Sequence, residues 1–159
     1  MKKIVSVLLF AALILCACAG AESVPDISDS LFSAAKEALS LLSYGECESV
    51  CDVLPFADVA PSAEEWANFA GNFSTLDSGT VQREISVAYW QNSSWSLAVP
   101  VSEPNKDSVE TLILRSDDGQ TFSGYKYATW GEARSGYESS DYVVWNEEYV
   151  AGTPVVIAD

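Results

Sequence analysis

Residues that could carry out catalysis are scarce in this sequence. It contains no histidine among 159 residues, which excludes Ser-His-Asp and Cys-His mechanisms and His-ligated zinc for this chain. Acidic side chains do occur as adjacent pairs that could supply an acid and a base: Glu64-Glu65, Asp117-Asp118 and Glu147-Glu148. Adjacent residues do not face each other, and a helix N-terminus and a turn account for the first two pairs. We therefore predict no catalytic residue, no metal site, no cofactor and no enzymatic activity.

Two cysteines, Cys47 and Cys51, are spaced as C-x-x-x-C. On a helix, positions i and i+4 lie about 6 Å apart with nearly parallel side-chain directions, which suits core residues better than an unstrained disulfide. Two thiols without histidine make a poor zinc site, and the acidic C-terminal third has no spaced EF-hand pattern for calcium. We expect two unpaired core thiols; a strained disulfide and a redox or metal role are the alternatives.

Aromatic side chains are the better indication of a binding site. Consecutive residues of a strand point to opposite faces, so Tyr89 and Trp90 cannot both fill one core. Tyr and Trp combine an apolar ring with a polar group, which suits pocket walls and interfaces. We predict a ligand site among six residues: Tyr89, Trp90, Trp95, Tyr125, Tyr127 and Trp130. The alternative is that most of these rings pack beneath helices. Arg83 or Lys126 would orient an anionic ligand group if either pointed inward, although we expect both at the surface.

The composition limits the class of protein. Lys and Arg number 8 against 23 Asp and Glu, which gives a formal charge of −15. Such a charge repels phosphate backbones, so we expect no nucleic-acid partner. Hydrophobic residues make up 48% and charged residues 19%, which excludes a disordered acidic tail and allows a compact core. The length predicts one domain.

The N-terminus has the pattern of an export signal. Met1-Lys2-Lys3 is basic, and the uncharged run from Ile4 to Ala17 is too short to span a bilayer comfortably. The sequence Leu15-Cys16-Ala17-Cys18 resembles the bacterial lipobox. This resemblance implies cleavage before Cys18 and attachment of a diacylglyceryl group to its sulfur.

We therefore predict a signal peptide over residues 1–17, followed by a lipidated Cys18 and a tether over 18–28. Loss of Lys2 and Lys3 would take the charge from −15 to −17. The alternative is cleavage by an ordinary signal peptidase at one of two small-x-small sites, which would give a secreted protein.

Helical periodicity precedes strand periodicity along the chain. Apolar spacing predicts three helices, over 29–44, 46–54 and 62–71. Asp29 or Ser30 would cap the first helix, and Ser62 with Glu65 has the capping-box pattern. From Thr80 the period changes to two and predicts strands over 80–90, 95–101, 109–115 and 120–130, with turns at 91–94 and 116–119. Gly124 would mark a bulge, residues 131–141 a linker, and 141–145 and 153–157 short edge strands.

Several short motifs occur in a characteristic order. These are Leu41-Leu42-Ser43-Tyr44-Gly45-Glu46-Cys47, Trp66, Gly71-Asn72-Phe73 and an Asp-Gly turn in the second hairpin. This order resembles the nuclear-transport-factor-two-like superfamily, in particular α+β domains of unassigned function in bacterial envelope lipoproteins, some ahead of an alpha/beta-hydrolase domain. The resemblance covers roughly Ser28 to Trp130. It implies a cone of helices on a curved sheet with an internal pocket, and a homodimer formed through the exposed sheet face.

The segment 142–157 faintly resembles the stretch that leads into the hydrolase domain, but the sequence has no Gly-x-Ser-x-Gly elbow. The chain is therefore either complete or a truncated relative of a longer protein. Together these features predict an α+β cone domain over 29–130, with N-terminal helices packed on a curved antiparallel sheet, and a C-terminal extension over 131–159.

We expect a lipoprotein anchored to the extracytoplasmic face of the cell membrane, whose domain binds a small molecule or an envelope protein without catalysis. The alternative function is an enzyme-like or hydrolase-accessory module that uses pocket carboxylates and tyrosines.

Overall fold

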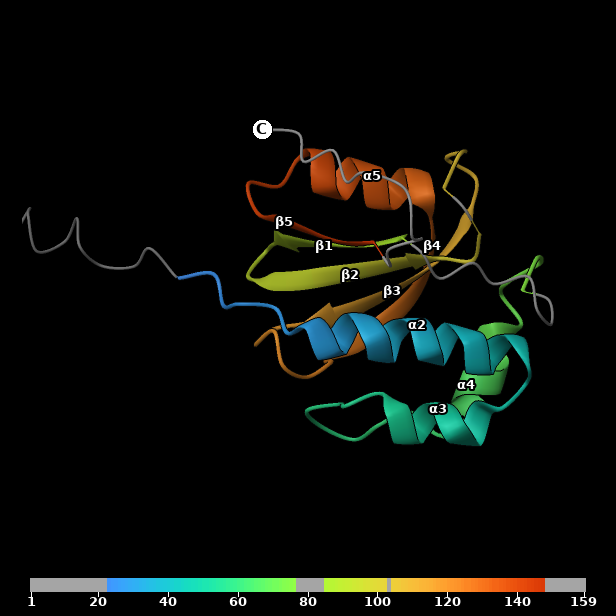
Figure 1. The fold of residues 1–159 in the computed structure, drawn as a ribbon. Coiled ribbons are helices and arrows are strands. Elements are labelled where there is room, and N and C mark those ends of the chain that lie inside the picture. Colours follow the sequence, from blue (N-terminus) through green and yellow to red (C-terminus); the bar gives the residue numbers. More distant parts are fainter. Residues whose placement is uncertain (1–22, 77–84, 103, 148–159) are drawn as a thin grey trace, which may run out of the picture.

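The computed structural model describes residues 23–76, 85–102 and 104–147. These residues form an α+β fold in which helices lie on both sides of one antiparallel sheet (Figure 1). The helices are α2 (Asp29–Ser43), α3 (Cys47–Val53), α4 (Ala63–Ala70) and α5 (Trp130–Glu138). The strands are β1 (Ile85–Gln91), β2 (Ser94–Pro100), β3 (Glu110–Ser116), β4 (Gly124–Thr129) and β5 (Val143–Glu147).

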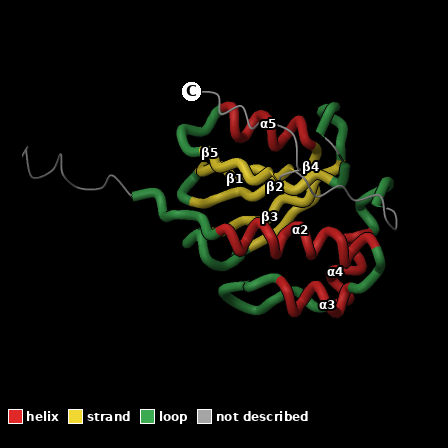
Figure 2. Tube along the Cα trace, viewed as in Figure 1, coloured by secondary structure: helices red, strands yellow, loops and turns green. Residues whose placement is uncertain are grey.

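The sheet has the strand order β4-β3-β2-β1-β5 and is antiparallel throughout (Figure 2). β1 and β2 are joined by Asn92 and Ser93, whose φ angles of 50° and 59° are those of a two-residue turn matched to strand twist. Trp90 therefore pairs with Trp95, as the predicted turn at 91–94 requires. β5 returns to the free edge of β1, so the last described strand lies beside the first.

The two faces of the sheet carry separate cores. One face packs against α2, α3 and α4 and is called the three-helix face; Leu97 and Leu114 lie on it. The opposite face packs against α5 and is called the α5 face; Val87 and Ile113 lie on it. Figure 1 shows the sheet between these two helical layers. The predicted helices on a sheet are confirmed, and the second layer is an addition to that prediction.

The three N-terminal helices form where the apolar spacing predicts them. The side chain of Ser28, rather than Asp29 or Ser30, caps α2 by accepting a hydrogen bond from the backbone of Ser30. The capping box of α4 is confirmed, because Ser62 and Glu65 each accept a hydrogen bond from the other's backbone nitrogen. Local side-chain caps therefore set the starts of α2 and α4, whereas α3 begins without a side-chain cap.

The prediction of a linker over 131–141 was wrong, because Trp130–Glu138 forms α5. Trp130, expected at the end of a strand, begins this helix, and the side chain of Thr129 caps it. Glycines weaken a helix in isolation. Here a Cβ on Gly131 would meet Asp107, and one on Gly136 would overlap the ring of Tyr89. The glycines allow α5 to approach the rest of the domain closely.

The predicted tight turn at 116–119 was also wrong, because β3 and β4 are joined by a longer loop over 117–123. The carboxylate of Asp118 organises this loop by accepting hydrogen bonds from the backbones of Gln120 and Thr121. These backbone bonds are the main reason why the pKa of Asp118 is lowered to about 2. Gly124 pairs with Arg115 in regular register as the first residue of β4, instead of forming a bulge.

The predicted edge strand over 141–145 is confirmed as β5, shifted by two residues. Residues 80–84 of the predicted first strand, including Arg83, lie outside the described residues, and so does the predicted strand over 153–157. The described helices include none that is long and apolar enough to span a bilayer.

Residues 24–28 of the predicted tether lie against the domain, and we call them the strap. Trp95 donates a hydrogen bond from Nε1 to the carbonyl of Pro25 over 2.8 Å. The backbone nitrogen of Ser28 donates to the carbonyl of Gly119 over 2.8 Å. Gly119 has a φ of +72°, and a Cβ there would overlap the carbonyl of Asp26. The strap is thus fixed to the end of the sheet that carries the β1–β2 turn and the β3–β4 loop.

Candidate functional site

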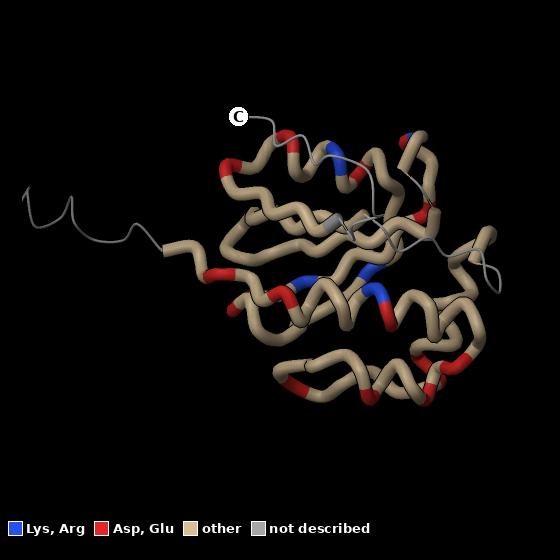
Figure 3. The backbone as a smooth tube through the Cα atoms, viewed as in Figure 1, with Lys and Arg blue, Asp and Glu red and all other residues tan. Residues whose placement is uncertain are grey.

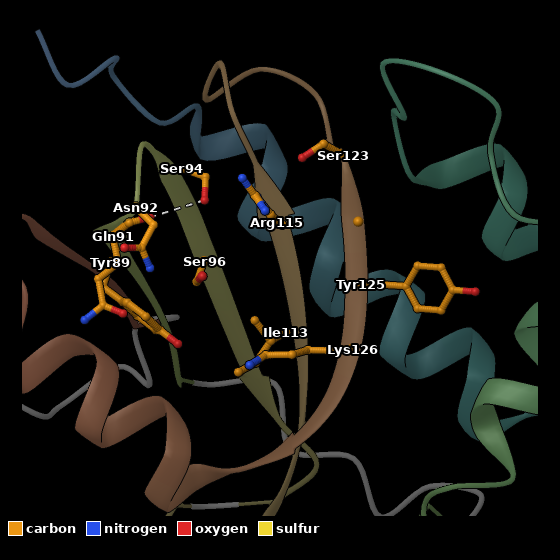
Figure 4. A pocket seen from close by; sticks show the side chains of 11 residues that line it. Tyr89, Gln91, Asn92, Ser94, Ser96, Ile113, Arg115, Ser123, Tyr125 and Lys126 are labelled. Carbon is orange, nitrogen blue, oxygen red and sulfur yellow. Dashed lines mark hydrogen bonds between the residues drawn. The ribbon is translucent and has the colours of Figure 1, made fainter. Parts of the chain in front are cut away.

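A cavity of about 450 Å³ opens on the α5 face of the sheet, and we call it the sheet-end pocket (Figure 4). Strands and turns line it rather than α5, and its polar side chains include Tyr89, Gln91, Ser94, Ser96, Arg115 and Lys126. Cavities of this size accommodate small molecules in other proteins. The described residues thus provide a concave site with several polar side chains at the end of the sheet where the strap is attached.

Strand register brings these side chains together. Tyr89 pairs with Ser96, Ser96 with Arg115, and Arg115 with Gly124, so one row crosses four strands. Lys126 lies two residues along β4 from Gly124 and therefore points to the same face. An aromatic hydroxyl, an aliphatic hydroxyl and two cationic groups are placed next to one another by backbone pairing alone.

Tyr89 is held in position by α5. Its side chain is only 4% exposed, and its ring lies directly against Gly136. The side-chain amide of Gln91 donates hydrogen bonds to the carbonyl of Gly136 and to the hydroxyl of Ser139, which fixes the end of α5 over β1. Burial raises the pKa of Tyr89, while the ammonium of Lys126 opposes this shift. Tyr89 is therefore a neutral hydroxyl at physiological pH.

Two cationic side chains lie at the pocket, and each has an acidic partner nearby. Arg115 Nε lies 3.1 Å from Asp117 Oδ1, and Lys126 Nζ lies 2.5 Å from Glu132 Oε1. The four side chains are each about half exposed, at 53 to 55%. Exposed ion pairs of this kind contribute about 0–1 kcal/mol, so they orient the cations without occupying them fully. Figure 3 shows how few Lys and Arg residues the described chain carries.

The comparisons with known proteins give no further guide to the site. No family model, no curated protein and no solved structure matches this chain. The interpretation of the pocket therefore rests on its own geometry and chemistry.

The six aromatic residues predicted to bind a ligand do not form one site. Tyr89 lies in the sheet-end pocket, but Tyr125 reaches the cavity only through its backbone, and Figure 4 shows its side chain pointing to the opposite face. There its ring packs 4.4 Å from that of Trp66. Trp90 and Trp95 pair with each other at 5.5 Å, also on the three-helix face.

The remaining two predicted aromatic residues lie elsewhere. Trp130 is 2% exposed and belongs to the core beneath α5, where it packs against Tyr137 and Trp145. Tyr127 lies at the opposite end of the sheet from the strap, and its hydroxyl donates to Glu110 over 3.2 Å. Strand parity separates Tyr89 from Trp90, because neighbouring strand residues face opposite sides of the sheet. Tyr127 faces the same side as Tyr125 but packs against Phe73, and Trp130 belongs to a helix.

A second cavity, of about 760 Å³, surrounds Glu110 and Tyr127. The Glu110 carboxylate accepts hydrogen bonds from the backbones and hydroxyls of Ser74 and Thr75 as well as from Tyr127. Burial raises its pKa, but the bonds from Thr75 and Ser74 outweigh this and bring it to about 2. A carboxylate engaged by five donors has no acceptor capacity left for a ligand. Glu110 instead ties the segment after α4 to β3.

The two cysteines and the acidic pair Glu64-Glu65 lie in or beside the N-terminal helices, away from the sheet-end pocket. Cys47 and Cys51 are free and half-buried, and the Cys51 thiol donates to the carbonyls of Cys47 and Pro61. Glu64 and Glu65 lie in the first turn of α4, as predicted from the helix N-terminus. Glu148 lies outside the described residues. In the part of the chain that the structure describes, no cluster of three Cys, Asp or Glu side chains could hold a metal ion.

Most residues that line the sheet-end pocket, Ser96 and Arg115 among them, were not predicted as site residues. The positions of Ser96 and Arg115 follow from the strand pairing across β1, β2 and β3. The first hairpin determines the β1–β2 part of this pairing. The pairing of Ser96 with Tyr89 follows from the two-residue turn within the predicted turn region 91–94. The wrong turn at 116–119 concealed the pairing of Arg115 with Gly124.

Proposed function

We propose that this chain is an exported lipoprotein, held to the extracytoplasmic face of a membrane through Cys18, whose α+β domain is a non-catalytic binding module. The sheet-end pocket is its ligand site. The observation that supports a binding role best is the row formed by Tyr89, Ser96 and Arg115, in which three different polar groups converge on one cavity. A small molecule, or one side chain of an envelope protein, fits a cavity of about 450 Å³.

The absence of carboxyl side chains from the pocket lining favours binding over catalysis by paired carboxylates. The described residues that line it include no Asp or Glu side chain. Glu110, which lines the second cavity, has a lowered pKa, whereas a general acid needs a raised one. A hydrolase-accessory role would use the same pocket without needing such groups.

The relation to nuclear-transport-factor-two-like domains is part of this proposal. Three helices followed by two hairpins occur in the order that the resemblance implies. The resemblance also implies a homodimer formed through an exposed sheet face. Helices pack on both faces of this sheet, so little sheet surface is free for such a contact. The dimer stays a prediction.

The anchor is tested by mass spectrometry of the protein purified from membranes of a producing bacterium. We expect a mature chain that begins at Cys18 and carries a diacylglyceryl group, and a Cys18→Ser variant that lacks this mass and leaves the membrane fraction. An unmodified N-terminus at Gly20 or Glu22, or an intact leader, would overturn the anchor.

A further inference from the structure

We propose that the sheet-end pocket takes the anionic group of its ligand, a phosphate or a carboxylate, between Arg115 and Lys126. This inference rests on the proposed binding function and names the ligand chemistry of the same site. The phenol of Tyr89 and the hydroxyl of Ser96 complete the set of donors around the anion.

The distribution of charge supports an anion at this place. The chain has a formal charge of −15, so basic side chains are the exception on its surface. The described part of the chain contains few of them: Lys36, Lys106, Arg115, Lys126 and Arg134. Arg115 on β3 and Lys126 on β4 line one cavity on one face of the sheet. Two adjacent strands thus bring two scarce cations together over a concave surface.

Arg115 and Lys126 can bind a ligand although each already contacts an acidic side chain. Arg115 uses Nε for Asp117, and a guanidinium carries four further N–H donors on its two other nitrogens. Lys126 pairs with Glu132, and both side chains are about half exposed at 53%. Exposed pairs are weak because solvent and salt screen them. A bidentate contact from Arg115 to a phosphate or carboxylate is geometrically specific and stronger.

The neutral donors make the pocket more than a pair of surface cations. Tyr89 is 4% exposed and packed against Gly136, so its hydroxyl is fixed beside Ser96 and near Lys126. A donor that is already ordered loses little entropy when it binds a ligand. Figure 4 shows these groups around one concavity, with Arg115 and Lys126 on neighbouring strands.

The position of the strap bears on where the anionic ligand comes from. The strap attaches at Gly119 and Trp95, next to the loop and turn that border the pocket. Four residues lie between Cys18 and Ser23, so the five Cα-to-Cα steps between them reach at most about 18 Å. A lipidated Cys18 would therefore hold the pocket end of the domain close to the bilayer surface. The anionic group could then belong to a lipid headgroup or to a soluble molecule.

The test uses the full mature lipoprotein, reconstituted in phosphatidylcholine nanodiscs and titrated calorimetrically with glycerol phosphate. We expect binding to the wild type and roughly tenfold to a hundredfold weaker binding for Arg115→Gln and Lys126→Gln. Arg134→Gln is the matched control, because Arg134 is a cation on α5 that pairs with Asp107 away from the pocket. Thermal unfolding of each variant confirms that it is folded. Equal affinity for all four proteins, or no binding to the wild type, would overturn the proposal.

A second arm separates the two sources. A photoactivatable phosphatidylglycerol in the discs should cross-link to the pocket of the wild type, and much less to Arg115→Gln, if the anion is a headgroup. Binding of glycerol phosphate without this cross-link would assign a soluble ligand, and both results support the anionic site. Failure of acylation at Cys18, found separately by mass spectrometry, overturns the anchor and leaves the calorimetric result on the pocket valid.

Discussion

The two faces of the sheet differ in how fully their side chains are used. On the three-helix face, Trp66 is completely buried, and its ring contacts those of Phe56, Phe69 and Tyr125. On the α5 face, an apolar core lies beneath the helix, but toward the strap the same face carries Ser96, Arg115 and Lys126 around a cavity.

This difference assigns stability mainly to the three-helix face and ligand binding to the strap end of the α5 face. Aromatic rings packed in a closed core contribute dispersion and burial, and they present no group to a ligand. Polar groups ordered by strand register at the edge of a core are available for a ligand. The many aromatic residues that suggested a binding site therefore mostly build the core, and the polar row beside them forms the pocket.

Replacement of Trp66 by alanine tests the first half of this comparison and has the largest expected effect. Removal of a fully buried indole should lower the free energy of unfolding by about 3–5 kcal/mol. The matched control is Trp145→Ala, because Trp145 is a tryptophan of the α5 face that is 46% exposed. This substitution should cost about 1 kcal/mol, because only about half of the Trp145 side chain is removed from water. Urea unfolding followed by circular dichroism measures both.

Equal losses for the two tryptophan variants would contradict the comparison, since they would place as much stability on the α5 face as on the three-helix face. Binding of glycerol phosphate should survive in Trp66→Ala at temperatures where this variant is folded.

Glu110 joins β3 to the segment after α4, and its substitution by glutamine has the next largest expected effect. Loss of a charged acceptor that receives bonds from Ser74, Thr75 and Tyr127 should cost about 2–3 kcal/mol at neutral pH. The control Glu37→Gln, at an exposed position of α2, should stay within about 0.5 kcal/mol of the wild type.

The effect of Glu110 should depend on pH in a defined direction. Its pKa is lowered from 4.5 to about 2 in the folded protein, so between these values the unfolded chain binds more protons than the folded one. Falling pH therefore favours unfolding in this window, and the contribution of Glu110 is lost progressively as the pH falls from about 4.5 to about 2. Urea unfolding from pH 7 to pH 2 should show a shallower decline for Glu110→Gln. If the free energy of unfolding fell equally with pH in the wild type and in Glu110→Gln, Glu110 would not be a cause of the acid destabilisation.

The sequence alone predicted those elements whose causes are local. Apolar spacing placed α2, α3 and α4 to within about two residues, the capping box placed the start of α4, and alternation placed most of the strands. The first hairpin also forms where it was predicted, because the polar residues 91–94 contain the two-residue turn at Asn92 and Ser93.

The features that sequence analysis missed depend on contacts far apart in the chain. α5 contains Gly131 and Gly136, which locally favour a linker, and only the approach of Asp107 and Tyr89 explains them. The β3–β4 loop is longer than predicted because Asp118 organises it and the strap packs against Gly119. The pocket residues come from four strands, so predicting the pocket requires the correct strand pairing in both hairpins. The wrong turn at 116–119 was enough to prevent that prediction.

Substitution of Gly136 by alanine has the smallest expected effect and tests the α5 face directly. At an exposed helical site, glycine to alanine stabilises by about 0.5–1 kcal/mol. Here the new Cβ would overlap the ring of Tyr89, so we expect destabilisation by about 1–2 kcal/mol in thermal unfolding. Ser135→Ala, one residue earlier on the exposed side of α5, should change the free energy of unfolding by less than about 0.5 kcal/mol.

A double-mutant cycle shows whether Tyr89 is the cause of that loss. Tyr89→Leu makes room for the new methyl group, so the double variant should be more stable than the sum of the single losses requires. Gly136→Ala should also weaken binding of glycerol phosphate, because it displaces the phenol from its place beside Ser96 in the pocket. Stabilisation by Gly136→Ala, or strictly additive losses, would show that helix propensity governs α5 and that the Tyr89 hydroxyl is not held in place by this contact.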